Sequence, residues 1–174
     1  TNYYLDGSLA NMTGESTKLG IDESRLYSAL SMIGELPYLD VHGFHVFAAS
    51  GVLEHSKLLE YVDYVFNLMS RLKSEGQKIE VIDFGGGFGI DYSGKEEQFD
   101  TQGFSDGLDK LCGKYGFKDT ELILELGRYI VGESGYYVAE IIDIKESKGK
   151  KHIIAAGGVN HLRLPSASGV NQPV

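Results

Sequence analysis

The sequence predicts an α/β fold in which a parallel sheet is built from alternating strands and helices. Three apolar segments of strand character cover residues 41–50, 78–84 and 120–126. Amphipathic helical patterns separate them, and a run of glycines directly follows the second segment. This alternation favours right-handed crossovers, either in an open doubly wound sheet or in part of a (β/α)8 barrel.

The expected helices are marked by apolar spacing and by the residues at their ends. Residues 22–36 begin with an aspartate that can cap a helix. Residues 53–76 form the longest amphipathic pattern and end with glycine, a common helix terminator. Shorter helices are expected over residues 105–116 and 128–134. The apolar face of the longest helix consists of Leu58, Val62, Val65, Phe66, Met69 and Leu72.

The pattern changes after residue 134. Residues 136–158 contain two extended runs around the turn-like sequence "SKGKK". We interpret residues 1–134 as one α/β unit, and residues 135–174 as crossover strands that enter a second, β-rich domain without completing it.

Composition narrows the class of protein. The chain has 174 residues, of which 42% are hydrophobic, and a net charge of −9, so a nucleic-acid or anionic membrane partner is not expected. The single cysteine, Cys112, cannot form an internal disulfide and has no second thiol for a metal site, so we expect no metal and a cytoplasmic location. Neither a membrane span nor a signal peptide is predicted. Because no methionine begins the chain, we expect a piece of a longer protein.

Polar groups and glycines follow each of the three strands, where parallel α/β folds bind their ligands. The first strand ends in Ser50, the second in Gly85–Gly87, and the third in Glu125, followed by Gly127 and Arg128. A hydroxyl, a row of backbone N–H groups and a guanidinium together predict a phosphate cradle. Because a carboxylate would repel phosphate, we expect Glu125 to face a positively charged part of the same ligand.

Simpler interpretations of these residues stay open at this point. Glycine-rich turns are common at strand–helix junctions, and this one lacks both the Walker lysine and the full GxGxxG spacing. Ser50 can be a loop residue, and Glu125 with Arg128 can be a solvated surface pair. His45 can be a hydrogen-bonded core residue, and Cys112 can serve packing alone.

Four ordered motifs carry a resemblance to a known family. The segments "GFHVFAAS", "DFGGGFGIDY", "ELGRYIVGESG" and "IDIKESKG" resemble motifs of the pyridoxal-phosphate-dependent decarboxylases that act on diaminopimelate, ornithine and arginine. The resemblance runs from "STKLGID" to "AAGGVNHLRLP". It implies that residues 1–134 are the later part of an alanine-racemase-like (β/α)8 barrel that binds pyridoxal 5′-phosphate, and that residues 135–174 begin its C-terminal β domain.

The resemblance also implies roles for individual residues. Gly85–Gly87 bind the cofactor phosphate through backbone amides, helped by Ser50, and Arg128 contacts the phosphate or a substrate carboxylate. Glu125 is the catalytic carboxylate that pairs with the protonated pyridine nitrogen and keeps the ring an electron sink. The remaining expected cofactor contacts are His45, Phe47, Gly89 and Gly127.

Departures from the family pattern bear on the substrate. Phe47 stands where the family usually has a histidine stacked on the ring, and it can stack without donating a hydrogen bond. Leu126 replaces a common proline. If Pro165 matches the family proline, Leu164 and Ser168 replace the arginine and tyrosine that hold diaminopimelate, although Arg163 directly precedes Leu164 and a shift of one residue would restore the match. We therefore expect the substrate to be an amino acid other than diaminopimelate, either free or bound to a carrier protein.

Two elements of the family are missing from the chain. No segment resembles the motif of the lysine that holds the cofactor as a Schiff base, and the late cysteine and aspartate motif at the dimer interface is also missing. We expect an inactive fragment of an enzyme that is a homodimer when intact. A non-catalytic cofactor-binding barrel and an amino-acid racemase of the same fold remain alternatives, although Glu125 disfavours a racemase. An unrelated phosphate-binding α/β enzyme is a third.

Overall fold

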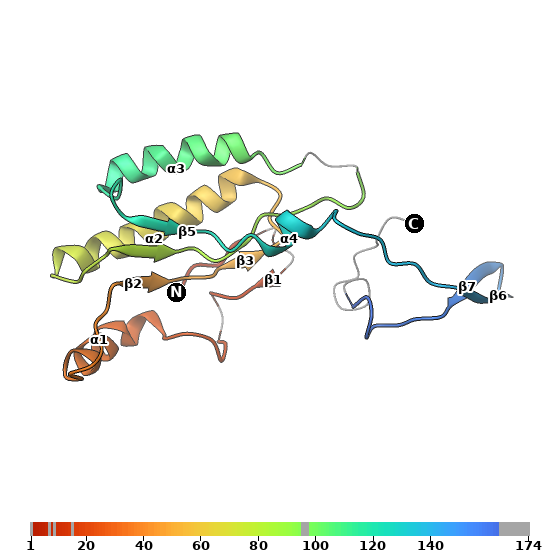
Figure 1. The fold of residues 1–174 in the computed structure, drawn as a ribbon, viewed down its shortest axis with the longest axis horizontal. Coiled ribbons are helices and arrows are strands. Elements are labelled where there is room, and N and C mark those ends of the chain that lie inside the picture. The colour runs from red at the N-terminus through yellow and green to blue at the C-terminus, as the bar shows by residue number, and fades with distance from the viewer. Residues whose placement is uncertain (1, 7, 9, 15, 95–97, 164–174) are drawn as a thin grey trace.

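A three-stranded parallel sheet forms the centre of the molecule (Figure 1). The computed structural model describes residues 2–6, 8, 10–14, 16–94 and 98–163. The strands are β2 (Gly43–His45), β4 (Val81–Asp83) and β5 (Glu121–Ile123), in the spatial order β2-β4-β5. Their register pairs His45 with Asp83 and Asp83 with Ile123, so the three strands end at the same level.

Two helices cover one face of this sheet (Figure 1). They are α2 (His55–Ser74) and α3 (Thr101–Tyr115), and Lys114 of α3 pairs with Asp63 of α2 at 2.6 Å. All six apolar residues predicted for the inner face of α2 are buried. Alternation along a strand sends neighbouring side chains to opposite faces, so Ile82 faces the helices and Asp83 faces away from them.

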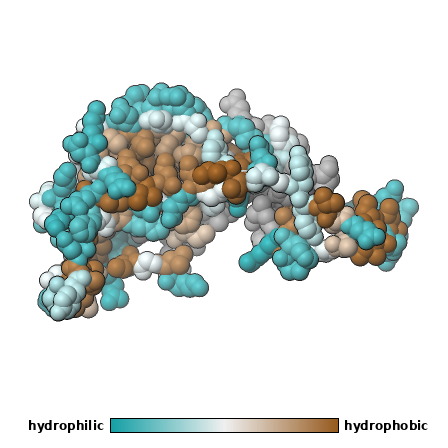
Figure 2. Space-filling view, viewed as in Figure 1, coloured by the Kyte–Doolittle hydropathy of each residue, from teal (hydrophilic) through white to brown (hydrophobic). Residues whose placement is uncertain are grey.

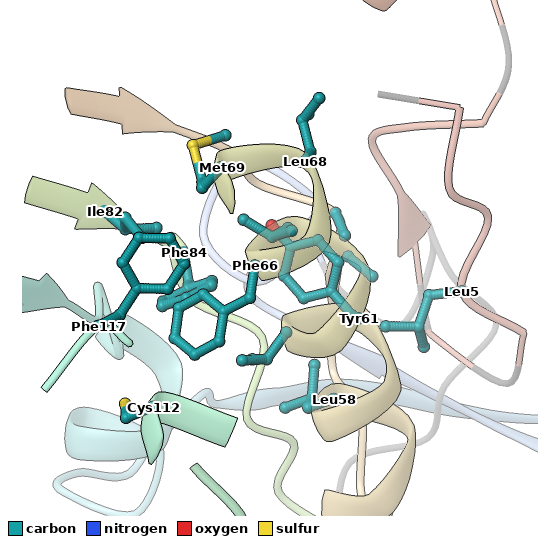
Figure 3. Packing of buried hydrophobic residues seen from close by; sticks show 14 of the residues in the cluster. Leu5, Leu58, Tyr61, Phe66, Leu68, Met69, Ile82, Phe84, Cys112 and Phe117 are labelled. Atoms are coloured by element: carbon teal, nitrogen blue, oxygen red, sulfur yellow. The ribbon is translucent and has the colours of Figure 1, made fainter. Parts of the chain in front are cut away.

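Aromatic residues fill the space between α2, α3 and the sheet. The Phe66 ring centroid lies 5.5 Å from that of Phe84 and 5.0 Å from that of Phe117, and all three side chains are buried (Figure 3). Burial of each such ring contributes about 1.5–3 kcal/mol. Cys112 is buried among the same residues, which confirms its predicted packing role.

The segments before α2 hold the first strand end in place. Strand β1 (Ala10–Asn11) pairs antiparallel with β3 (Ala49–Ser50), and Tyr61 of α2 donates to the carbonyl of Val46. The 3₁₀ turn η1 (Glu23–Arg25) precedes α1 (Leu26–Gly34), and Leu30 is the buried residue of this helix.

The chain after the sheet forms the short helix α4 (Gly127–Val131) and then a hairpin of β6 (Ile141–Ser147) and β7 (Lys150–Ala155). The hairpin turn uses left-handed backbone at Lys148 and Gly149. The hairpin lies apart from the parallel sheet, with apolar residues on its surface (Figures 1 and 2). The predicted domain boundary at residue 134 stays a prediction. None of the helices in the described part of the chain combines the length and apolarity needed to cross a bilayer.

Several predicted elements differ from the structure in their limits, and two of these differences have a clear physical cause. The single strand expected over residues 41–50 is split into β2 and β3, because β2 pairs with β4 whereas β3 pairs with β1. Helix α3 begins four residues earlier than expected, since Asp100 caps it by accepting from the Gly103 N–H at 2.8 Å.

Candidate functional site

Each glycine of the triplet is required for a different steric reason. Gly85 has a φ of +67°, and a Cβ atom there would lie 2.7 Å from Cδ2 of Phe47. A Cβ on Gly86 would lie 2.6 Å from the carbonyl oxygen of Glu125. Gly87 has a φ of +134°, and a Cβ there would lie 3.2 Å from the carbonyl oxygen of Ala49. Only a chain without side chains can pass between the ends of the neighbouring strands in this way.

Hydrogen bonds fix the loop at both ends. The N–H of Gly85 donates to Oδ1 of Asp83 at 2.8 Å, and the Gly85 carbonyl accepts from Glu125 N–H at 2.7 Å. Val52 donates to the Gly87 carbonyl at 2.8 Å and accepts from Gly89 N–H at 2.7 Å. Within the described residues, the amides of Gly86 and Gly87 donate to no acceptor, so these two N–H groups are available to an anion.

Arg128 supplies a cation beside the loop. Its atom Nη1 is buried and has no hydrogen-bond partner among the described residues. A buried donor without an acceptor is unfavourable unless a ligand supplies that acceptor. Guanidinium groups bind phosphate or carboxylate well. Glu125 and Arg128 form no ion pair in the described part of the chain, so the interpretation of these two as a surface pair is wrong.

A cavity of about 190 Å³ joins these groups. Seven of the ten predicted site residues line it: Phe47, Ser50, Gly86, Gly87, Glu125, Gly127 and Arg128. Phe88, Leu126 and Tyr129 complete the lining. Gly85 and Gly89 flank the two open amides and are engaged in the contacts described above. The cavity therefore offers an anion-binding side, an apolar aromatic wall and a carboxylate.

His45 lies beside the carboxylate. Its atom Nε2 is 3.7 Å from Oε2 of Glu125, and 55% of its side chain is exposed, so the core interpretation of this histidine is wrong. One ligand atom each from His45, Asp83 and Glu125 lies within 4.8 Å of the others. This spacing alone does not define a cation site, because exposed acidic groups gather in many proteins without one.

Asp83 is the residue of this group that sequence reasoning missed. The available signal was its place at the end of β4, one residue after buried Ile82 and two before the glycine that it holds. Its neighbours across the sheet depend on strand register, which the local sequence does not specify.

These groups fit a phosphorylated, nitrogen-containing ring. Two open amides and a buried guanidinium suit a phosphate, and the Phe47 ring offers an apolar contact surface. The Glu125 carboxylate suits a protonated ring nitrogen, because opposite charges at close range favour each other's charged forms.

Comparison with known proteins agrees with this geometry. The sequence profile described as "Pyridoxal-dependent decarboxylase, pyridoxal binding domain" matches residues 6–132. The chain belongs to this family. The expected family and its pyridoxal cofactor are thereby confirmed.

Individual relatives cover most of the chain. A Staphylococcus aureus 2-[(L-alanin-3-ylcarbamoyl)methyl]-2-hydroxybutanedioate decarboxylase is 30% identical over 94% of this chain and 41% of its own length. An L-glutamyl-[BtrI acyl-carrier protein] decarboxylase of Niallia circulans is 31% identical over 89% of this chain and 37% of its own. The chain thus spans about two fifths of the length of these relatives.

A solved structure confirms the predicted fold. The diaminopimelate decarboxylase of M. jannaschii, crystallised in complex with L-lysine, superposes with a TM-score of 0.79. It is 30% identical, and the match covers 91% of this chain and 38% of that one. The chain is therefore part of a decarboxylase-type α/β barrel. Leu164, Pro165 and Ser168, on which the expectation about diaminopimelate rests, lie outside the described residues, and Arg163 is exposed.

Proposed function

We propose that this chain forms the phosphate and ring-nitrogen side of the cofactor site in a pyridoxal-phosphate-dependent amino-acid decarboxylase. The observation that carries the proposal concerns Arg128, whose buried Nη1 has no partner among the described residues and which lines the same cavity as Gly86 and Gly87. Glu125 lines that cavity too, so one ligand can meet both charges.

The residues of the site bind different parts of the cofactor according to their charge. Gly86, Gly87 and Arg128 bind the phosphate, and Ser50 adds a hydroxyl from the end of β3. Glu125 holds a proton on the ring nitrogen, and Phe47 packs against the ring face. Pyridoxal phosphate, when bound, accepts the electron pair that is left as carbon dioxide departs, which is why the proton on the ring nitrogen matters.

The substrate is an amino acid, and we propose one other than free diaminopimelate. Support comes from the relatives in Staphylococcus aureus and Niallia circulans, whose names give a substituted alanyl compound and a carrier-bound glutamyl group as substrates. Phe47 supports the same proposal, because its ring cannot donate a hydrogen bond where the family usually has histidine. We further propose a cytoplasmic homodimer as the complete enzyme.

The test is to add pyridoxal phosphate to the purified chain, record the absorbance spectrum, reduce with borohydride and map any modified lysine by peptide mass. We expect saturable binding that inorganic phosphate displaces, with no single lysine labelled. Binding that phosphate does not displace would contradict the proposed cradle. Stoichiometric labelling of one lysine would contradict the expectation that the covalent anchor lies outside this chain.

A further inference from the structure

Asp83 lies close to both charged halves of the proposed site. The phosphate half consists of Gly86, Gly87 and Arg128, and the ring half contains Glu125. Asp83 ends β4, is paired in register with His45 on β2, and precedes the first glycine of the loop by two residues. Ile82 faces the helices, so Asp83 faces the opposite side of the sheet together with His45. Glu125 follows Ile123, the β5 partner of Asp83, by two residues and therefore emerges on that same side.

The Asp83 carboxylate meets the phosphate half through a hydrogen bond. Its Oδ1 accepts from Gly85 N–H at 2.8 Å, which closes a turn with left-handed backbone at Gly85. This turn determines where the next two amides lie. Because Gly85 also accepts from the Glu125 N–H, the same turn fixes the backbone of the carboxylate residue.

The Asp83 carboxylate meets the ring half through charge. Two carboxylates, those of Asp83 and Glu125, lie within 4.8 Å of the His45 imidazole and of each other. Like charges at this separation repel, and a nearby histidine offsets the repulsion when it is protonated. The His45 imidazole lies within 4.8 Å of both carboxylates, and its Nε2 is 3.7 Å from Oε2 of Glu125.

We propose that Asp83 is a positioning residue that couples the phosphate loop to Glu125, through Gly85 on one side and through His45 on the other. The inference rests on the proposed function. It predicts that Asp83→Asn and Asp83→Ala affect the two halves of the site differently. Asparagine keeps the acceptor for the Gly85 N–H and loses the charge, whereas alanine loses both.

The test compares Asp83→Asn, Asp83→Ala and His45→Gln with two probes. Inorganic phosphate, followed by ³¹P NMR, reports the loop. Pyridoxine 5′-phosphate, whose near-ultraviolet absorbance responds to protonation of its ring, reports the Glu125 side. Asp106→Asn, which removes the same charge from the exposed surface of α3, is the matched control.

We expect Asp83→Asn and His45→Gln to bind phosphate within about twofold of the original chain while the bound absorbance shifts. Asp83→Ala should weaken phosphate binding about tenfold as well, which is the order expected for the loss of one ordering hydrogen bond. Asp106→Asn should change neither reading.

Two results would overturn the coupling. One is wild-type phosphate affinity in Asp83→Ala, and the other is an unshifted absorbance in both Asp83→Asn and His45→Gln. These outcomes leave the proposed function intact, because the original chain still binds both probes. If the original chain binds neither probe, the proposed function fails, and this inference fails with it.

Discussion

At the scale of single residues, anion binding is expected to depend most on Arg128. Replacing it by glutamine removes the charge from a buried donor that has no partner among the described residues. We expect phosphate affinity to fall at least about tenfold, because hydrogen bonds to charged groups contribute roughly 1.5–3 kcal/mol. The ligand-free variant should unfold at no lower temperature, since a buried cation without a partner adds nothing to stability.

Phosphate titration by calorimetry and a thermal melt measure these two effects. Arg25→Gln is the matched control, because Arg25 is exposed in η1 and does not line the cavity. Equal weakening in both variants would mean that overall charge, rather than the position of Arg128, governs binding.

Gly86 limits the distance between the loop and β5. A methyl group there meets the backbone oxygen of Glu125, which cannot rotate away as a side chain can. Gly86→Ala should therefore lower the free energy of unfolding by about 1–3 kcal/mol, the range for overpacked sites. It should also weaken phosphate binding. Gly135→Ala is the control, since no atom lies within 4 Å of the added methyl group. Wild-type affinity in Gly86→Ala would show that the loop can move without losing its ligand.

At the scale of elements, we expect glycine-to-alanine substitutions at two positions of α3 to change stability in opposite directions, because one of these positions lies against α2. In α3, Gly113→Ala adds a methyl group at ordinary contact distance from Lys118 and should stabilise the chain by roughly 0.5–1 kcal/mol. Gly107→Ala places its methyl group 2.2 Å from Leu59 of α2. We expect it to destabilise by about 1 kcal/mol, because Leu59 must move. Urea unfolding measures both, and equal stabilisation would mean that Leu59 repacks without loss.

Helices were easier to predict than strands for physical reasons. The apolar face of α2 repeats along a helix of 20 residues, so its buried residues could be identified without any partner. By contrast, residues 41–50 contain only a short apolar run, and its division into β2 and β3 depends on pairing with β4 and β1. Such pairing is set by tertiary contacts that a local pattern does not contain.

At the scale of the whole molecule, buried ionisable groups should make the fold sensitive to alkali. Burial raises the pKa of the Tyr61 hydroxyl above its ordinary value of 10.0, and the nearby Asp83 charge adds to this. Burial likewise raises the pKa of the Cys112 thiol above 9.0. The unfolded chain releases these protons at lower pH than the native chain does. The free energy of unfolding should therefore fall as pH rises above about 9.

Urea unfolding at pH 7.5, 9 and 10.5 measures this loss. Cys112→Ala should remove the part that begins near pH 9, and Tyr61→Phe the part that begins near pH 10, although each also lowers stability at pH 7.5. A free energy that stays constant from pH 7.5 to 10.5 would contradict the expectation.

The proposed site could be assembled from the sequence because its residues stand at, or just after, the ends of three expected strands. These residues are Ser50, the glycine triplet, Glu125 and Arg128, and parallel strands end at one edge of a sheet. The hydrogen-bond partner of each group could not be predicted in the same way. Gly85 was expected to bind phosphate through its amide, but that amide has an internal acceptor in Asp83, whose role depends on register and on a turn.

The close approach of the glycine loop to both neighbouring strands limits how this motif can be engineered. Gly85 touches Phe47, Gly86 touches the Glu125 backbone, and Gly87 touches the Ala49 backbone. The peptide "DFGGGFG" grafted onto another scaffold would lack the surfaces that shape it, and its glycines would leave it as a loose coil. A transplant that retains its ligand must carry residues 47–50 and the segment after β5 along with the loop, as one three-part insert.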